Sequence, residues 1–480
     1  MSKSSSKSPV SKDVKLAKEY EKEKKRSEKL FRQRYPNIDE MEVIHRNAAG
    51  IDLGGKTSHY VAIEIGNEIE VREFGMVTSQ LYEMARYLLD NGVTSVAMES
   101  TGVYWVPVLD LFEKIGLEAY LVNPTHAKNV PGRQKTDKLD CRWLQKLHKF
   151  GLLAASFRPA EEIRPLRSYI RHRTTLVKEC ADCMRRMQKL LDMMNVRLHK
   201  AVSDMGGVTG MRILRAIVDG ARDPHMLAEL RDPRCKLSKE EITEELTGFY
   251  QDHFILQLGS VLRLYDAYLN EISVIDGYIK CELEKLAPVD VDIDEEISLD
   301  THKMPKGKHA PDFNTSAYIE LVTDRDPTII PGIGPQIALG LLGELGKDMS
   351  KWPTVKHFGS YLGLAPQQKI SGKRVLSSRT RLGLHPAAVL FKQAAAGILD
   401  SLDCALTAFY RQLAARRGKG KALTALAYRI ARQYYNLMKY SQEYVEIGER
   451  GFEEKNRERQ IKYLNKKAKQ LGFEVTPVAA

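Results

Sequence analysis

The stretch from residue 97 to residue 141 constrains the fold most, because it places three carboxylates at the ends of predicted elements. A short apolar strand ends at Glu99, and a further helix and strand lead to Asp137 and Asp140 at the start of another helix. Ahead of this stretch, Asp52 lies on an apolar strand that stops at a glycine pair. These four acids form the candidate site.

A cluster of four carboxylates needs a compensating cation. Two carboxylates about 4 Å apart repel by about 4 kcal/mol at an effective dielectric of 20, which is a large share of the stability of a domain. Oxygen ligands select hard divalent ions, here expected to be Mg²⁺ or Mn²⁺. Two such ions about 4 Å apart can bind the attacking and the leaving oxygen when a phosphodiester is cleaved. The proposed ligands include no histidine or cysteine, which argues against zinc.

The composition points to a polyanionic partner. The chain has 480 residues, enough for two or three domains, and its 74 Lys and Arg against 62 Asp and Glu leave a formal charge of +12. No apolar run approaches the ~20 residues of a membrane span, and the N-terminus lacks the apolar core of a signal peptide. We therefore expect no membrane partner and a cytoplasmic location, with association with the nucleoid during action.

Between residues 43 and 151 the patterns predict three strands and then alternating helices and strands. The strands are expected around Ile51 and at 60–65, 70–76, 95–98 and 119–122, and the helices at 79–90, 104–115 and 137–150. This order predicts an α/β domain with a mixed sheet and is typical of a ribonuclease-H-like fold.

Ligands of such open sheets gather beyond the carboxyl ends of strands, where Asp52 and Glu99 would lie if their strands are neighbours. Asp137 and Asp140 share one face of their helix. Without the other acids, this pair would be expected only to stabilise the first turn of that helix.

Beyond Pro159 the pattern changes to heptads, which predict a long coiled-coil helix that pairs within the chain or between subunits. The apolar positions are Ile163, Leu166, Ile170, Val177, Cys180, Met184, Met187, Leu191, Met194 and Leu198, broken where Arg173 takes one position. The polar faces carry Arg164, Arg167, Arg171, Lys178, Arg185, Arg186 and Lys189. These cations form either a solvated face or a surface that follows phosphates. The CxxC pair of Cys180 and Cys183 is expected to belong to the core rather than to a metal or redox site.

The C-terminal part contains two loops suited to phosphate. Residues 330–335 resemble the hairpin of a helix–hairpin–helix module, whose glycines let backbone amides approach a phosphate, although punctuation between two helices is the alternative. Farther along, Ser371 lies beside Gly372 in the basic loop from Lys369 to Arg374. Its hydroxyl is a candidate nucleophile, and an ordinary turn is the alternative.

Together these motifs resemble the DEDD-type transposases of bacterial insertion sequences, the IS-one-ten group, whose members are RNA-guided DNA recombinases that use a bridge RNA. The shared motifs are Gly50-Ile51-Asp52, Met98-Glu99-Ser100-Thr101-Gly102, Lys135-Thr136-Asp137 with Asp140, and Lys369-Ile370-Ser371-Gly372. The resemblance covers the chain from about residue 48 to residue 472. The group commonly has Ser-Gly-Gly-Lys where this chain has Ser-Gly-Lys-Arg at 371–374.

The resemblance implies that Asp52, Glu99, Asp137 and Asp140 hold divalent metal in a RuvC-like domain and that Ser371 is the nucleophile of a C-terminal transposase domain. It also implies donor and target double-stranded DNA and a structured guide RNA as partners. It further implies a homo-oligomer, a dimer or tetramer, in which the acids of one subunit meet the serine of another.

The resulting domain prediction has six segments. They are a basic flexible tail (1–40), a RuvC-like DEDD catalytic domain (41–155), a helical and coiled-coil region (156–288), a linker (289–316), a mostly α C-terminal transposase domain (317–445) and a charged C-terminal tail (446–480). The predicted function is RNA-guided recombination through a covalent serine–DNA intermediate. The alternatives are a junction-resolving metal nuclease, in which water attacks, and an inactive nucleic-acid-binding assembly protein.

Overall fold

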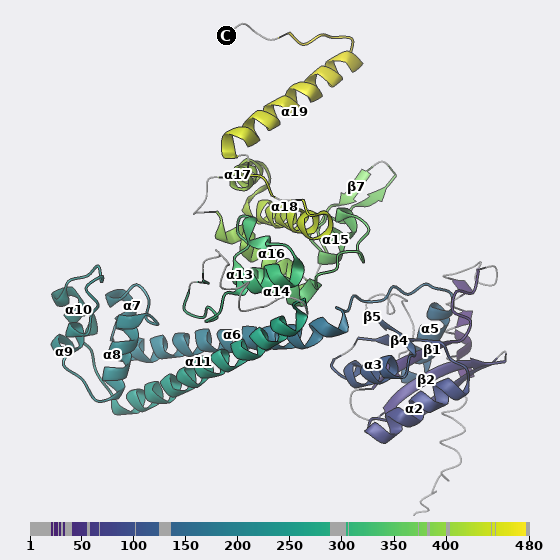
Figure 1. The fold of residues 1–480 in the computed structure, drawn as a ribbon, viewed down its shortest axis with the longest axis horizontal. Coiled ribbons are helices and arrows are strands. Elements are labelled where there is room, and N and C mark those ends of the chain that lie inside the picture. The colour runs from purple at the N-terminus through teal and green to yellow at the C-terminus, as the bar shows by residue number, and fades with distance from the viewer. Residues whose placement is uncertain are drawn as a thin grey trace, which may run out of the picture. The chain divides into compact units, whose positions relative to one another are not determined.

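The computed structural model of the chain divides into two compact units, Met1–Arg158 and Pro159–Ala480 (Figure 1). The described residues are 21–22, 24–26, 28–29, 32–33, 41–54, 58–66, 68–100, 102–123, 136–288, 304–305, 307–372, 374–381, 385–399, 404–442, 444–446 and 448–476. Among them, no helix combines the length and the apolar character that a membrane crossing requires. Residues 1–20 of the predicted tail (1–40) and residues 289–303 of the predicted linker (289–316) lie outside the described residues.

A five-stranded sheet in the order β3-β2-β1-β4-β5 forms the centre of the first unit. The strands are β1 (Ala48–Leu53), β2 (Ser58–Ile65), β3 (Glu68–Gly75), β4 (Ser95–Glu99) and β5 (Glu118–Val122). The first three strands pair antiparallel, as expected when short turns connect them, whereas β4 pairs parallel with both β1 and β5. The predicted mixed sheet is confirmed, and it fits a ribonuclease-H-like core.

Helices cover both faces of this sheet. On one face, α2 (Thr78–Asp90) and α3 (Trp105–Lys114) bury apolar side chains such as Met84 and Phe112 against Ile51 and Met98. On the other face, α5 (Asp137–Lys149) packs Trp143, Leu144 and Leu147 around Ala97 and Val122. The alternation of side chains along β1 and β4 therefore separates two cores, and α5 lies on the face that Asp52 and Glu99 share.

The N-terminal segment contacts this layer. Every described residue between positions 21 and 33 is helical, where we predicted a flexible tail. The Glu28 carboxylate lies 3.7 Å from Lys146 Nζ and 3.9 Å from Arg142 Nη2 on α5. This part of the tail therefore adds a charged contact to α5.

Two long helices begin the second unit. After the short 3-10 helix η2 (Glu161–Ile163), α6 (Arg164–Met193) packs along α11 (Asp252–Leu286) of the same chain (Figure 1). The two run antiparallel, because Tyr169 stacks on Tyr278, while Arg173, farther along α6, bonds Asp276, which comes earlier in α11. The buried residues of α6 are Leu166, Arg173, Leu176, Cys180, Cys183, Met187, Leu190 and Leu191. The predicted apolar seam is thus covered within one chain.

The structure refines the predicted helix in two ways. The helix ends at Met193, and Asn195 adopts a left-handed φ of 54°, so the predicted continuation to Leu198 is interrupted. We assigned Val177 and Met184 to the seam, but the residues buried at these two points are Leu176 and Cys183, each one position earlier in the chain. Cys180 and Cys183 are buried free thiols, as expected of core residues.

Short elements complete the second unit. Four helices lie between α6 and α11: α7 (Leu198–Ala201), α8 (Val208–Val218), α9 (Pro224–Glu229) and α10 (Lys239–Leu246). After α11 follow α13 (Thr315–Thr323), η3 (Pro327–Ile329), α14 (Pro335–Leu345), α15 (Val355–Leu362), β6 (Lys369–Ser371), β7 (Arg374–Ser377), α16 (Pro386–Gly397), α17 (Ala405–Arg417), α18 (Lys419–Tyr440) and α19 (Gly448–Gln470). In α19 only Phe452 is buried, so this helix is mostly solvated.

Arg173, the exception in the heptads, is buried as part of an ion pair. Its guanidinium bonds both carboxylate oxygens of Asp276, and Nη2 also donates to the His309 carbonyl at 2.6 Å. Both side chains of the pair are almost fully buried. A charge can occupy the seam because its partner and the carbonyl replace the water that it loses.

We expect Asp276→Ala to lower the free energy of unfolding by about 3–5 kcal/mol, because it leaves a buried guanidinium without its carboxylate. Asp266→Ala is the matched control on the same helix, since it removes a similar but exposed fork to Arg215 and should cost no more than about 1 kcal/mol. Urea unfolding of the full chain measures both. Equal losses in the two variants would contradict the structural role of the buried pair.

Candidate functional site

The parallel pairing of β1 with β4 places Asp52 beside Glu99. The register pairs Ile51 with Met98, so the next residues along the two strands are Asp52 and Glu99, and they point to the same face. Glu99 is only 7% exposed, whereas Asp52 is half-buried. The backbone N–H and the hydroxyl of Ser100 both bond the Val122 carbonyl at the end of β5, which anchors the chain just after Glu99.

Helix α5 lies unusually close to this part of the sheet. A Cβ at Gly50 would meet Gln145 N at 2.2 Å and Cys141 O at 2.3 Å, so only glycine permits this approach. Polar side chains of α5 also form hydrogen bonds with the sheet. Gln145 Nε2 donates to the Ala48 carbonyl of β1 at 3.3 Å, and His148 Nε2 lies 3.0 Å from Ser95 Oγ of β4. These bonds determine how α5 is rotated on the sheet.

This rotation directs the start of α5 toward Asp52. Cys141 and Gln145 face the sheet, and Asp137, one turn before Cys141, lies on the same side of the helix. Burial first, and then the negative charge of Asp52, raise the pKa of the Cys141 thiol to about 12. Cys141 and Asp52 are therefore close in space.

Tyr60 provides a second link between the sheet and α5. It pairs with Asp52 across β1 and β2. Its pKa is raised by burial, then by Glu73, and further by the negative charge of Asp137. The first turn of α5, with Asp137 and Asp140, thus lies at the same edge of the sheet as Asp52 and Glu99.

The four acids share one edge without forming a closed coordination shell. Among the described residues, no three His, Cys, Asp or Glu side chains are grouped closely enough to hold a metal ion. The donors that the four acids offer are carboxylate oxygens. This donor set fits a hard divalent ion, and the metal-binding role stays a prediction. The motif residues Thr101 and Lys135 lie outside the described part of the chain.

Ser371 lies at the tip of the hairpin formed by β6 and β7. It pairs with Arg374, and Gly372, directly after it, has a left-handed φ of 56°. The Ser371 side chain is exposed, and so are the apolar side chains of Ile370, Val375 and Leu376 nearby. An exposed hydroxyl on a basic hairpin suits either a nucleophile or a turn, so its role stays a prediction. Lys373 lies outside the described residues.

The two chain segments that flank this hairpin are joined by a partly buried hydrogen bond. The Tyr361 hydroxyl lies 2.7 Å from His385 Nε2, and His385 Nδ1 accepts from Ala387 N at 3.2 Å. Because Nδ1 accepts, the proton of the neutral ring is on Nε2, which donates to Tyr361. Burial lowers the pKa of His385 to about 4 and keeps the ring neutral.

A buried carboxylate lies next to this pair, and sequence reasoning missed it. Glu344 on α14 is 5% exposed and accepts from Arg171 Nε at 2.7 Å and from Arg167 Nη2 at 2.9 Å. Burial alone would raise the pKa of Glu344, but the bond from Arg171 and the charges of both arginines lower it. Arg167 and Arg171 of α6, which we considered for phosphate, therefore bind a carboxylate of the same unit.

The glycine-rich segment before α14 has a packing role. Gly332 has a φ of 89°, and a Cβ there would lie 2.4 Å from the Ala394 carbonyl of α16. Gly343, within α14, lies against Ile170 of α6, where a Cβ would be 2.8 Å from Ile170 Cδ1. Close helix packing accounts for both glycines, and the helix–hairpin–helix function stays a prediction.

We expect His385 to make stability depend on pH between about 4 and 6.5. The pKa of this residue is about 6.5 in the unfolded chain, so between pH 6.5 and 4 the unfolded chain binds a proton and the folded ring stays neutral. The free energy of unfolding therefore falls as the pH drops through this window, by up to about 3 kcal/mol. His385→Asn keeps an N-cap acceptor for α16 but does not titrate, so its curve should be flatter. Denaturant unfolding between pH 4 and 7 measures the difference.

His357→Asn, at an exposed histidine of α15, is the matched control and should follow the wild-type curve. A His385→Asn curve parallel to that of the wild type would contradict the assignment of a neutral, partly buried ring.

Two parts of the chain match known transposase domains. Residues 49–196 match a family model described as a transposase, of the DEDD type of the IS110 group, and residues 328–410 match the model "Transposase IS116/IS110/IS902 family". A comparison with curated proteins gives no match. The first match covers all four acids, and the second covers Ser371 and the buried Glu344. The two matches support a transposase of the IS110 family, and DNA transposition is the activity that they imply.

Proposed function

We propose that this protein is an RNA-guided recombinase that cuts and rejoins donor and target DNA through a covalent bond to Ser371. The observation that carries the proposal is the exposed Ser371 hydroxyl in a hairpin in which Ser371 pairs with Arg374. A guanidinium group beside an exposed hydroxyl suits a phosphodiester, because it binds the phosphate oxygens while the hydroxyl approaches phosphorus.

The proposed step is a transesterification. Ser371 Oγ attacks phosphorus, an Oγ–P bond forms, the P–O bond to one DNA segment breaks, and the serine proton goes to the departing oxygen. Attack by a DNA hydroxyl on the phosphoserine reverses the step and rejoins a strand. An alcohol is a weak nucleophile at neutral pH, so the step needs activation.

The carboxylates of Asp52, Glu99, Asp137 and Asp140 would hold Mg²⁺ or Mn²⁺ in the first unit. When bound, such ions lower the pKa of a coordinated hydroxyl and stabilise charge on phosphate. The support for this assignment is the edge that the four acids share and their oxygen-only donor set. Glu99 is buried at the end of β4, and the backbone directly after it is anchored by the bond from Ser100 N to the Val122 carbonyl.

A guide RNA and a shared active site complete the proposal. Their support is the family resemblance together with the formal charge of +12. Sequencing of the RNA that co-purifies with the protein from its native host should recover one discrete RNA, and a heterogeneous mixture alone would contradict guidance.

If a dimer or tetramer combines the acids of one subunit with the serine of another, mixing Ser371→Ala chains with Glu99→Ala chains should restore covalent product.

A hydrolytic nuclease of the junction-resolving kind is the second candidate. The observation that favours it is that all four acids lie in one unit with its own sheet and two cores. In this case water attacks the phosphodiester and Ser371 is only a turn residue. The two candidates differ in whether DNA becomes covalently attached to protein.

We expect Mg²⁺ or Mn²⁺ to raise the thermal stability of the wild type but not that of Asp52→Ala, because binding to the folded state alone stabilises it by about 2.7 kcal/mol at a hundredfold excess over Kd. Asp110→Ala is the matched control: it removes a carboxylate of the same unit that bonds Arg158 Nη2 at 2.6 Å, and it should keep the metal response. Differential scanning calorimetry measures all three proteins. An equal metal response in Asp52→Ala would refute the assignment.

We expect Ser371→Ala to bind nucleic acid and metal normally and to form no covalent adduct with DNA, because the attacking oxygen is gone. Denaturing gels with end-labelled DNA detect the adduct. Ser377→Ala, at the end of β7, and Ser378→Ala are controls in the same hairpin and should still form it. An adduct with Ser371→Ala would exclude this nucleophile, and no adduct with the wild type under any metal condition would favour the hydrolytic nuclease.

A further inference from the structure

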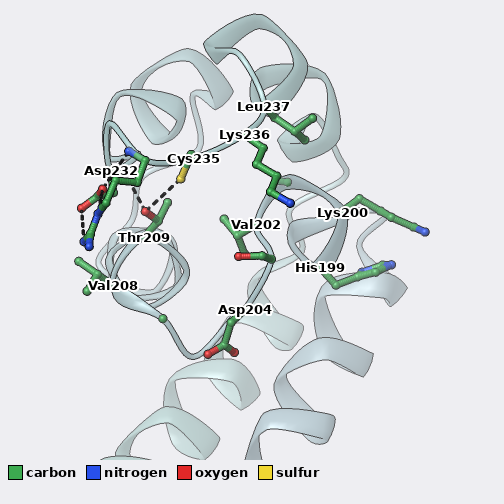
Figure 2. A pocket seen from close by; sticks show the side chains of 14 residues that line it. His199, Lys200, Val202, Asp204, Val208, Thr209, Asp232, Cys235, Lys236 and Leu237 are labelled. Atoms are coloured by element: carbon green, nitrogen blue, oxygen red, sulfur yellow. Dashed lines mark hydrogen bonds and ion pairs between the residues drawn. The ribbon is translucent and has the colours of Figure 1, made fainter. Parts of the chain in front are cut away.

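A cleft lies between α7, the start of α8 and the loop that joins α9 to α10. Its volume is about 590 Å³, and its walls come from three segments, residues 199–204, 207–209 and 232–237 (Figure 2). All three lie outside the two matched regions, which end at residue 196 and resume at residue 328. The cleft is large enough for part of a nucleotide chain or a small ligand.

The cations of the cleft differ in whether a carboxylate neutralises them. Arg234 forms a fork with Asp232, through Nε at 2.8 Å and Nη2 at 3.2 Å, and these bonds lower the pKa of Asp232 to about 2. Lys200 and Lys236, by contrast, form no ion pair with any described residue. Lys236 extends from its loop into the opening, and Lys200 extends outward from α7 at the rim (Figure 2).

The wall around Lys236 is held in place by hydrogen bonds. The Thr209 hydroxyl, on the first turn of α8, accepts from Asp232 N at 2.9 Å and lies 3.5 Å from Cys235 Sγ (Figure 2). Asp204, the remaining acid of the lining, accepts from Gly206 N at 2.9 Å. The loop that carries Lys236 is therefore fixed before any ligand binds, which lowers the cost of ordering it on binding.

We propose that this cleft binds the phosphate backbone of a nucleic acid, with Lys236 inside the opening and Lys200 at its rim. Two lysines without carboxylate partners attract a polyanion, and bound phosphates release their counterions. The proposal rests on the proposed function for its partner, a nucleic acid, and adds a contact outside both transposase domains. Duplex DNA and structured RNA share the phosphate chemistry and are separated by the test.

The test combines Lys200→Glu with Lys236→Glu in the full chain and compares it with Lys280→Glu combined with Lys285→Glu. The control changes the net charge equally, but its lysines lie on α11 next to Glu284 and Glu282. Fluorescence anisotropy with labelled duplex DNA, and separately with structured RNA, gives Kd over a range of salt concentrations.

We expect the cleft variant to weaken binding of one of these nucleic acids about tenfold or more, and to reduce the slope of log K against log salt by about 2, with the control unchanged. The nucleic acid that responds is the ligand. Equal affinities and slopes in the wild type and the cleft variant, with both folded by circular dichroism, would overturn the cleft proposal alone. A wild type that bound neither nucleic acid would overturn the proposed function as well.

Discussion

The parallel pairing of β1 with β4 is the constraint on which the candidate site depends. It places Asp52 and Glu99 on adjacent strands at the same height and on the same face. Gly50 then admits α5 so closely that its backbone contacts β1, and the bonds from Gln145 and His148 hold the rotation of the helix. Asp137 and Asp140 reach the same edge only because of that rotation. A side chain at position 50 would push α5 away from β1 and so displace Asp137 and Asp140, although neither acid is itself substituted.

Such an arrangement costs stability in the absence of a cation. Glu99 is buried, and a buried carboxylate close to another one loses hydration and gains repulsion. The second unit also contains a buried acid, Glu344, which has two arginine partners and a lowered pKa. Glu344 therefore joins α14 to α6 and has a structural role within its unit.

The sequence predicted what depends on local pattern. The strands of the first unit begin and end within a few residues of their predicted positions, because alternation and turn residues act over short distances. Arg173 interrupted the heptads, but its partner Asp276 lies 103 residues away on a helix that no local signal connects to α6. Glu344 and the cleft around Lys236 likewise depend on long-range packing. The edge shared by the four acids could be predicted from strand order, whereas the distances between their oxygens could not.

Anomalous X-ray diffraction from crystals grown with Mn²⁺ tests the central claim most directly, because it locates the ion without relying on activity. We expect an anomalous peak at the carboxyl ends of β1 and β4, with oxygens of Asp52, Glu99 and at least one acid of α5 about 2.2 Å away. No peak at this edge, at Mn²⁺ concentrations that raise the melting temperature of the protein, would contradict it.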